Sequence, residues 1–231
     1  MTKKSAARRQ EVSINAGGHI ITPSRTEKLL GAVISEDMKW NEHLVQSNKS
    51  LVSQLTSRIN GLSKVASRAP VATRFVIANG IFMSKLVYLI HLWGNSSKYL
   101  LKSLQILQNR AARVVKWYSW WTPVRRLLKD CKWLSINQLV FYHTTLQTHK
   151  SLISGKPHYF KQNFNTDHPY RTRQSTGGGI WRGKEDLIST GFSSRGAQAY
   201  NSFPPSIRGC RTIGTFKYKL QKWVATNIPI D

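Results

Sequence analysis

The stretch LQNRAARVVKWYSWWTPVRR, from Leu107 to Arg126, decides how the rest of the chain is interpreted. Its apolar residues recur at the three- and four-residue steps of a soluble helix, yet all of its charged residues are basic. No Asp or Glu lies between Glu42 and Asp130, whereas 14 Lys and Arg do. Soluble domains carry charges of both signs. We therefore expect a molecule outside the chain to supply the missing negative charge.

The composition predicts a folded, strongly basic protein. The chain has 231 residues, of which 40% are hydrophobic and 10% aromatic, and this is too apolar for a disordered polycation. Its net charge is +25, and a polyanion relieves the resulting repulsion. Nucleic acid is the favoured partner. Anionic membrane and simple solubility are the alternatives, but the basic residues are spread from Lys3 to Lys222 rather than clustered beside an apolar face.

Two further features limit where the chain acts. The apolar run from Phe75 to Trp93 contains Lys85 and is interrupted at Asn79-Gly80, so we expect a buried helix and no membrane partner. The two cysteines are too few for a secreted disulfide framework, and the basic N-terminus has no apolar run behind it. These features favour the nucleus or the cytoplasm.

The pattern predicts a mainly α fold with a small N-terminal β-hairpin. Residues 11–40 have strand and turn signals, and helical periodicity begins at Asn41 and continues through Ser67. A second helix is expected from Pro70 to Trp93 and a third from Ser96 or Ser97, which together form a three-helix bundle. The expected inner positions of the first helix are Leu44, Leu51, Leu55, Ile59, Leu62 and Ala66, and those of the third are Leu100, Leu104, Leu107, Ala111, Val114 and Val115.

A helical, loop-rich extension is expected after the bundle. A short helix should begin at Thr122-Pro123. A longer helix should begin at Ser135 and end near Ser154-Gly155. Residues 156–191 are rich in Gly and Pro, and a last helix should span Thr215–Thr226 with Phe216, Leu220, Trp223 and Val224 inward. We therefore expect three parts: the N-terminal strands (1–40), the three-helix bundle (41–118) and the helical, loop-rich extension (119–231).

No motif for catalysis or metal binding stands out. The adjacent acidic pairs, Glu36-Asp37 and Glu185-Asp186, fit exposed turns better than a two-metal site. The chain has no phosphate-binding loop or hydrolase motif. Cys131, His143 and His149 lack the spacing of a zinc site. We expect no catalytic residue, no bound metal and no cofactor.

Aromatic and basic residues crowd together after the third helix. Trp117, Tyr118, Trp120 and Trp121 could stack on bases while neighbouring cations contact phosphates. For each ring taken singly, packing between helices is the favoured interpretation. Arg171 and Arg173, beside Tyr170, could also contact a phosphate backbone or simply face solvent.

Six motifs occur in order along the chain. The first, TEKLLGAVISEDMKWNEHL, contains Leu30-Gly31, Trp40 and His43. LQILQNRAARVV, the region Leu128–Leu134, HPYRTR, RGAQAYNSFPPSIR and GTFKYKL follow it. In this order they resemble motifs of reverse transcriptases of jockey-like non-LTR retrotransposons, over about residues 10–226. The first resembles the block after that family's catalytic hairpin, from which Leu29 and Ala32 depart, and Tyr200 and Phe203 depart from the later motifs.

This resemblance implies a thumb and a C-terminal extension without the catalytic palm. The family's catalytic aspartates, which hold Mg²⁺, would lie upstream in a palm and fingers portion that could be a partner. Leu30-Gly31 would belong to a primer-grip strand, and residues 41–117 would follow a template–primer duplex. The expected nucleic-acid-binding residues are Leu30, Gly31, Lys64, Arg68, Arg110, Arg113, Lys116, Arg125, Arg126, Arg171 and Arg173.

Three functional hypotheses stay open at this point. The leading one is a catalytically incomplete part of an RNA-directed DNA polymerase that binds RNA/DNA duplex with little sequence preference. The second is a stand-alone RNA-binding protein derived from such an element, and the third is a translated remnant that would expose apolar surface and aggregate.

Overall fold

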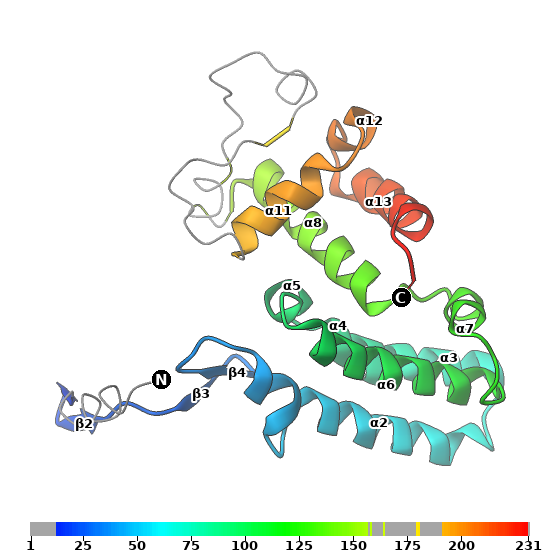
Figure 1. The fold of residues 1–231 in the computed structure, drawn as a ribbon, viewed down its shortest axis with the longest axis horizontal. Coiled ribbons are helices and arrows are strands. Elements are labelled where there is room, and N and C mark those ends of the chain that lie inside the picture. The colour runs from blue at the N-terminus through cyan, green and yellow to red at the C-terminus, as the bar shows by residue number, and fades with distance from the viewer. Residues whose placement is uncertain (1–12, 157, 159–163, 165–178, 181–190, 231) are drawn as a thin grey trace. The chain divides into compact units, whose positions relative to one another are not determined.

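A computed structural model describes residues 13–156, 158, 164, 179–180 and 191–230 (Figure 1). The chain divides into two compact units, Met1–Leu51 (unit 1) and Val52–Asp231 (unit 2). The prediction of a mainly α fold with N-terminal β-hairpin structure is confirmed. The boundary at Leu51 lies inside the expected 41–118 part, and the 119–231 part shares unit 2 with the residues before it. The functional division into three parts stays a prediction.

Unit 1 contains two antiparallel hairpins. In the first, β1 (Ile14–Ala16) pairs with β2 (His19–Ile21) across Gly17-Gly18, whose φ angles of 60° and 87° suit glycine. In the second, β3 (Thr26–Leu29) pairs with β4 (Ala32–Ser35), from Thr26 opposite Ser35 to Leu29 opposite Ala32.

The first expected helix is interrupted after one turn. A π-helical turn, η1 (Glu42–Gln46), ends at Ser47, whose backbone is extended, and α2 begins only at Leu51 and ends at Ala66. The Ser47 hydroxyl accepts a hydrogen bond from the Lys49 amide at 3.0 Å, which is the local bonding by which serine competes with a helix. The prediction of one helix through residues 41–67 was therefore wrong at this point, although all six expected inner positions are buried.

Trp40 and His43 connect the second hairpin to η1. The Val33 amide donates to His43 Nδ1 at 3.3 Å, and the two rings meet edge to face at 5.9 Å between centroids. Both matched positions of the resemblance thus have a packing role inside unit 1.

The second expected helix is also divided. It forms α3 (Val71–Ala78), the π-helical segment η2 (Asn79–Met83), α4 (Ser84–Val87) and α5 (Ile90–Trp93). The break falls at Leu89, whose φ is +55°, and the Tyr88 oxygen beside it accepts a hydrogen bond from Trp93 Nε1 at 2.9 Å. The helix after it ends at Gly94, as expected.

The third helix, α6 (Lys98–Lys116), connects the bundle to the following segment. Its expected inner residues are buried except Val114, which is partly buried. Gln108 is completely buried and donates to the Leu134 oxygen at 2.9 Å, while Gln105 accepts from the Ile136 amide at 2.8 Å. These two side chains pair otherwise unsatisfied backbone groups, so α6 is fixed against the start of the next long helix.

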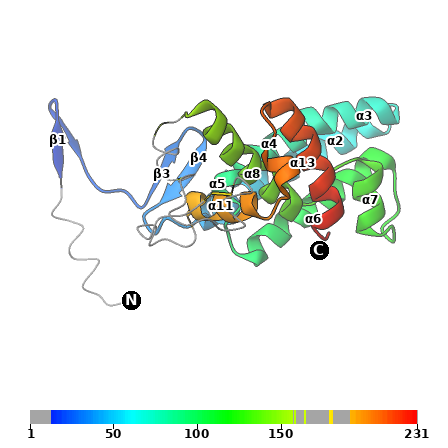
Figure 2. The ribbon, with the colours of Figure 1, turned by 90° about the horizontal axis from the view of Figure 1, so that it is seen from above.

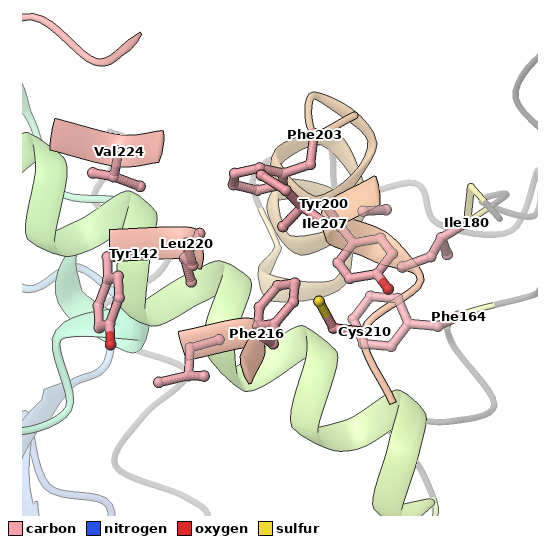
Figure 3. Close-up of a cluster of buried hydrophobic side chains, with 12 residues drawn as sticks. Tyr142, Phe164, Ile180, Tyr200, Phe203, Ile207, Cys210, Phe216, Leu220 and Val224 are labelled. Carbon is pink, nitrogen blue, oxygen red and sulfur yellow. The ribbon is translucent and has the colours of Figure 1, made fainter. Parts of the chain in front are cut away.

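The remaining helices form a second buried layer. After α7 (Val124–Asp130), α8 (Ile136–Ser154) begins with a Ser135–Gln138 capping box and ends at Gly155, whose φ is +64°. The structure adds α11 (Phe192–Asn201) and α12 (Pro205–Arg208), which the periodicity did not predict, and α13 (Ile213–Asn227) matches the expected last helix. Side chains of α8, α11 and α13 meet in an aromatic-rich cluster (Figure 3). Most of residues 156–191 lie outside the described part.

Candidate nucleic-acid interface

One end of unit 2 gathers the residues that the opening stretch singled out. The connection between α6 and α7 lies there with the end of α2 and the start of α3 (Figures 1 and 2). Arg110 on α6 donates to Asn60 on α2 at 3.1 Å, and Arg74 on α3 donates to the Val114 oxygen at 3.4 Å. We call this region the basic–aromatic end. It comprises Lys64, Arg68, Arg74, Arg110, Arg113, Lys116, Trp117, Tyr118, Trp120, Trp121, Arg125 and Arg126.

Three tryptophans of this end face solvent. The exposed fractions are 61% for Trp117, 76% for Trp120 and 85% for Trp121. Packing between helices, which the sequence favoured for each ring, is therefore wrong for these three. Large aromatic side chains are usually mostly buried in a folded domain. Three exposed rings within five residues form a surface suited to stacking on unpaired bases.

The backbone beneath the rings is held by hydrogen bonds. Trp117 ends α6 in a left-handed conformation with φ of +55°, and the amides of Trp117 and Tyr118 both donate to the Arg113 oxygen. Arg113 Nη2 donates to the backbone oxygens of Trp120 and Thr122 at 3.2 and 3.5 Å. The loop conformation is thus fixed while its indole rings stay outside, which limits the entropy lost when a ligand stacks on them.

Two arginines also contact the rings directly. The Arg113 guanidinium lies 5.2 Å from the Trp120 ring centroid, and the Arg74 guanidinium lies 5.2 Å from that of Trp117. Arg74 is buried, and its role was missed because α3 has no sequence signal that separates an inward arginine from an outward one. A cation above an indole attracts the ring's π electrons and so orients it.

Tyr118 and Arg126 share the carboxylate of Asp130. The Tyr118 hydroxyl donates to Asp130 Oδ2, and Arg126 Nε lies 3.8 Å from the same oxygen. The hydrogen bond to Asp130 raises the pKa of Tyr118. Arg126 also lies 5.8 Å from the Tyr118 ring centroid. This group joins the α6–α7 connection to α7.

The expected cations differ in what they contact. Lys64, Arg68 and Arg125 are exposed, and Arg126 and Arg110 are exposed with the partners given above. Lys116 is half-buried. Arg113 is turned towards the loop backbone, a contact that the sequence did not predict. Arg171 and Arg173 lie outside the described residues.

Leu30 and Gly31 lie in unit 1 and form a turn rather than part of a strand. They connect β3 to β4 with φ angles of +48° and +82°, a conformation of two-residue hairpin turns. Leu30 is 81% exposed. Their expected place within a strand was therefore wrong, because the pairing of Leu29 with Ala32 leaves both residues outside the ladder. Their expected role at a primer end stays a prediction.

The charge imbalance persists in the folded unit. The described part of unit 2 contains 22 lysines and arginines and a single carboxylate side chain, that of Asp130. Because Asp130 already contacts Arg126 and Tyr118, it offers little neutralisation to cations elsewhere. The described part of unit 2 therefore has a strongly positive potential.

The cysteine and the two histidines that the sequence raised as zinc candidates are buried or partly buried. Burial raises the pKa of Cys131 to about 11 and lowers that of His143 and of His149 to about 4. Among the described residues, no group of three or more His, Cys, Asp or Glu could hold a metal ion. Within the same residues, no helix combines the length and apolar character that crossing a bilayer requires.

Comparisons with protein-family models, with curated proteins and with solved structures found no match to this chain.

Proposed function

We propose that this chain binds nucleic acid through the basic–aromatic end of unit 2. In this proposal exposed cations face the phosphate backbone, and the indole rings of Trp117, Trp120 and Trp121 stack on unpaired bases. The observation that carries it is that three exposed tryptophans lie beside exposed cations, in a unit whose described part has 22 lysines and arginines and one carboxylate side chain. Such a surface holds nucleic acid with little sequence preference, because phosphates and base faces are common to all sequences.

We further propose that the chain is the thumb and C-terminal part of a non-LTR reverse transcriptase. The ordered motifs of the sequence support this proposal, and the helical bundle of α2, α3 and α6 is compatible with it. The catalytic carboxylates and their Mg²⁺ would belong to a palm portion, so this chain alone would not polymerise. Incorporation of deoxynucleotides by the purified chain would contradict this part of the proposal.

A salt titration tests the binding proposal. We expect fluorescence anisotropy with a labelled RNA/DNA hybrid to give a log–log salt slope of about −3 to −4, since the exposed Lys64, Arg68, Arg125 and Arg126 would each contribute about −0.9. Arg68→Ala should reduce the magnitude of this slope by about 1. A slope near zero, or an unchanged slope in the variant Lys64→Ala/Arg68→Ala/Arg126→Ala, would reject the proposed interface.

A stand-alone RNA-binding protein is the second candidate. It is favoured over a degraded remnant by the aromatic-rich cluster of α8, α11 and α13, in which Phe216, Leu220 and Val224 are completely buried. A clear preference for one folded RNA over RNA/DNA hybrid in the same titration would favour this candidate over the polymerase part.

A further inference from the structure

A cavity separate from the exposed tryptophans is lined by residues of α7, of the turn after it, of the start of α8, of α13 and of the chain after α13. Figure 1 shows where these segments lie. Its volume is about 520 Å³, which is within the range of small-molecule sites, about 300–1,000 Å³. It therefore has room for a single nucleotide and not for a base-paired duplex.

One wall of this cavity is basic. Arg125 and Lys129 lie one turn apart on α7, and Lys132 follows in the turn after the helix. All three are exposed, and in the part of the chain that the structure describes no ion pair or hydrogen bond occupies their charged groups. Arginine and lysine donate charge-assisted hydrogen bonds to phosphate oxygens, so these three residues suit a phosphate.

Apolar residues also line the cavity, and hydrogen bonds hold part of this lining in place. These apolar residues include Trp133, Leu134 and Ile228. Trp133 Nε1 donates to Asn79 Oδ1 at 3.0 Å, and Gln138 Nε2 donates to the Ile228 oxygen at 2.7 Å. These hydrogen bonds hold the indole and the chain after α13 in position, so the cavity exists before a ligand enters it.

We propose that this cavity binds one nucleotide of a single-stranded segment, with its phosphate on Arg125, Lys129 and Lys132 and its base against Trp133, Leu134 and Ile228. The inference deepens the proposed nucleic-acid binding and rests on it. A base reaches an apolar wall only when it is unstacked, so the cavity selects a single strand over a duplex. A cavity lined by both basic and apolar side chains matches the two chemically different halves of a nucleotide.

The experiment compares a blunt RNA/DNA hybrid with the same hybrid carrying a short single-stranded overhang, using the full chain and fluorescence anisotropy. The wild type should bind the overhang substrate at least about fivefold tighter, since stacking one base is worth about 1–3 kcal/mol. Lys129→Ala/Lys132→Ala should remove this preference and lower the magnitude of the salt slope for the overhang substrate by about 1.4. Arg125 is left unchanged because it also belongs to the basic–aromatic end.

The matched control is Lys217→Ala/Lys222→Ala, which removes the same charge from the exposed side of α13. It should keep the overhang preference. With binding to the blunt hybrid intact, either of two results would overturn the inference. One is that both variants lose the overhang preference equally, and the other is that Lys129→Ala/Lys132→Ala keeps the full preference. If the wild type binds neither substrate, the proposed function itself is rejected.

Photocrosslinking locates the base without any substitution. With 5-iodouridine at the first overhang position, we expect crosslinks to Trp133 or to residues 228–230. Crosslinks confined to Trp117, Trp120 and Trp121 would place the base on the exposed rings and overturn the inference.

Discussion

Arg113 joins three parts of the candidate interface through one guanidinium. Its Nη2 donates to the backbone oxygens of Trp120 and Thr122, and the guanidinium plane lies 5.2 Å from the Trp120 ring. A hydrogen bond from a charged donor contributes about 1.5–3 kcal/mol. In the proposed function Arg113 is therefore a positioning residue that keeps Trp120 available for a base.

We expect Arg113→Ala to lower affinity for oligouridylate about tenfold, because the α6–α7 connection loses the contacts that fix Trp120. Trp120→Ala should have a similar effect. The double variant should lose much less than the sum of the two, since both changes remove one stacking contact. Anisotropy titrations of the four proteins measure this coupling.

Arg113→Lys keeps the charge but not the forked donor geometry, so it should restore little of the lost affinity. Full restoration by lysine would mean that the charge of Arg113 contacts phosphate directly, as the sequence had suggested.

At the scale of elements, α8 carries the buried His149 and the partly buried His143. His149 stacks on Phe216 of α13 with 3.6 Å between ring centroids, and its Nδ1 lies 3.3 Å from the hydroxyl of Tyr200 on α11. Burial lowers the pKa of His149 to about 4. For His143, burial is again the main cause of the lowered pKa, and His91, Lys150 and Lys217 add to it.

This packing predicts that acid destabilises unit 2. A histidine whose pKa is about 4 when folded and 6.5 when unfolded stabilises the fold fully above pH 6.5. As pH falls from 6.5 towards 4, the unfolded state binds the proton first, and the free energy of unfolding drops by up to about 1.4 kcal/mol per pH unit for each such histidine. Urea denaturation at pH 7 and pH 5 measures this change.

His149→Gln provides the control, because glutamine does not titrate and can still bond to Tyr200. The variant should be less stable than the wild type at pH 7 but should lose less stability between pH 7 and pH 5. Identical pH dependence in the two proteins would show that His149 is not buried in its neutral form.

For the whole molecule, the positive charge that suits a polyanion also opposes folding. The described part of unit 2 has 22 cations and one carboxylate, so like charges repel within the compact state. We expect the melting temperature to rise when NaCl increases from 20 to 200 mM, because the Debye length falls from about 20 Å to about 7 Å and screens this repulsion. Differential scanning fluorimetry measures the shift.

A melting temperature that falls over this salt range would contradict the expectation and point to stabilising ion pairs instead. The same measurement with inorganic polyphosphate distinguishes screening from binding, since a bound polyanion should raise the melting temperature at concentrations far below those of NaCl.

Much of the helical architecture could be predicted from the sequence. The inner positions Leu55, Ile59 and Leu62 of α2 and Leu104 and Ala111 of α6 are buried as expected, because a helix repeats every 3.6 residues and its apolar stripe must face a core. The cap at Ser135 and the end at Gly155 were likewise readable, since both depend on local backbone geometry. The breaks at Ser47 and Leu89 were not, because they depend on local hydrogen bonds that compete with the helix.

The sequence by itself determined that this chain is mainly helical, basic and without a carboxylate side chain between Glu42 and Asp130, since these properties follow from counting and periodicity. Only the tertiary structure decided which groups are presented outward. It turned Arg113 and Arg74 onto backbone oxygens and left Trp117, Trp120 and Trp121 exposed. The reason is that a polar side chain bonds to the backbone groups near it that have no other partner. Which backbone groups lie near it depends on how the chain packs in three dimensions.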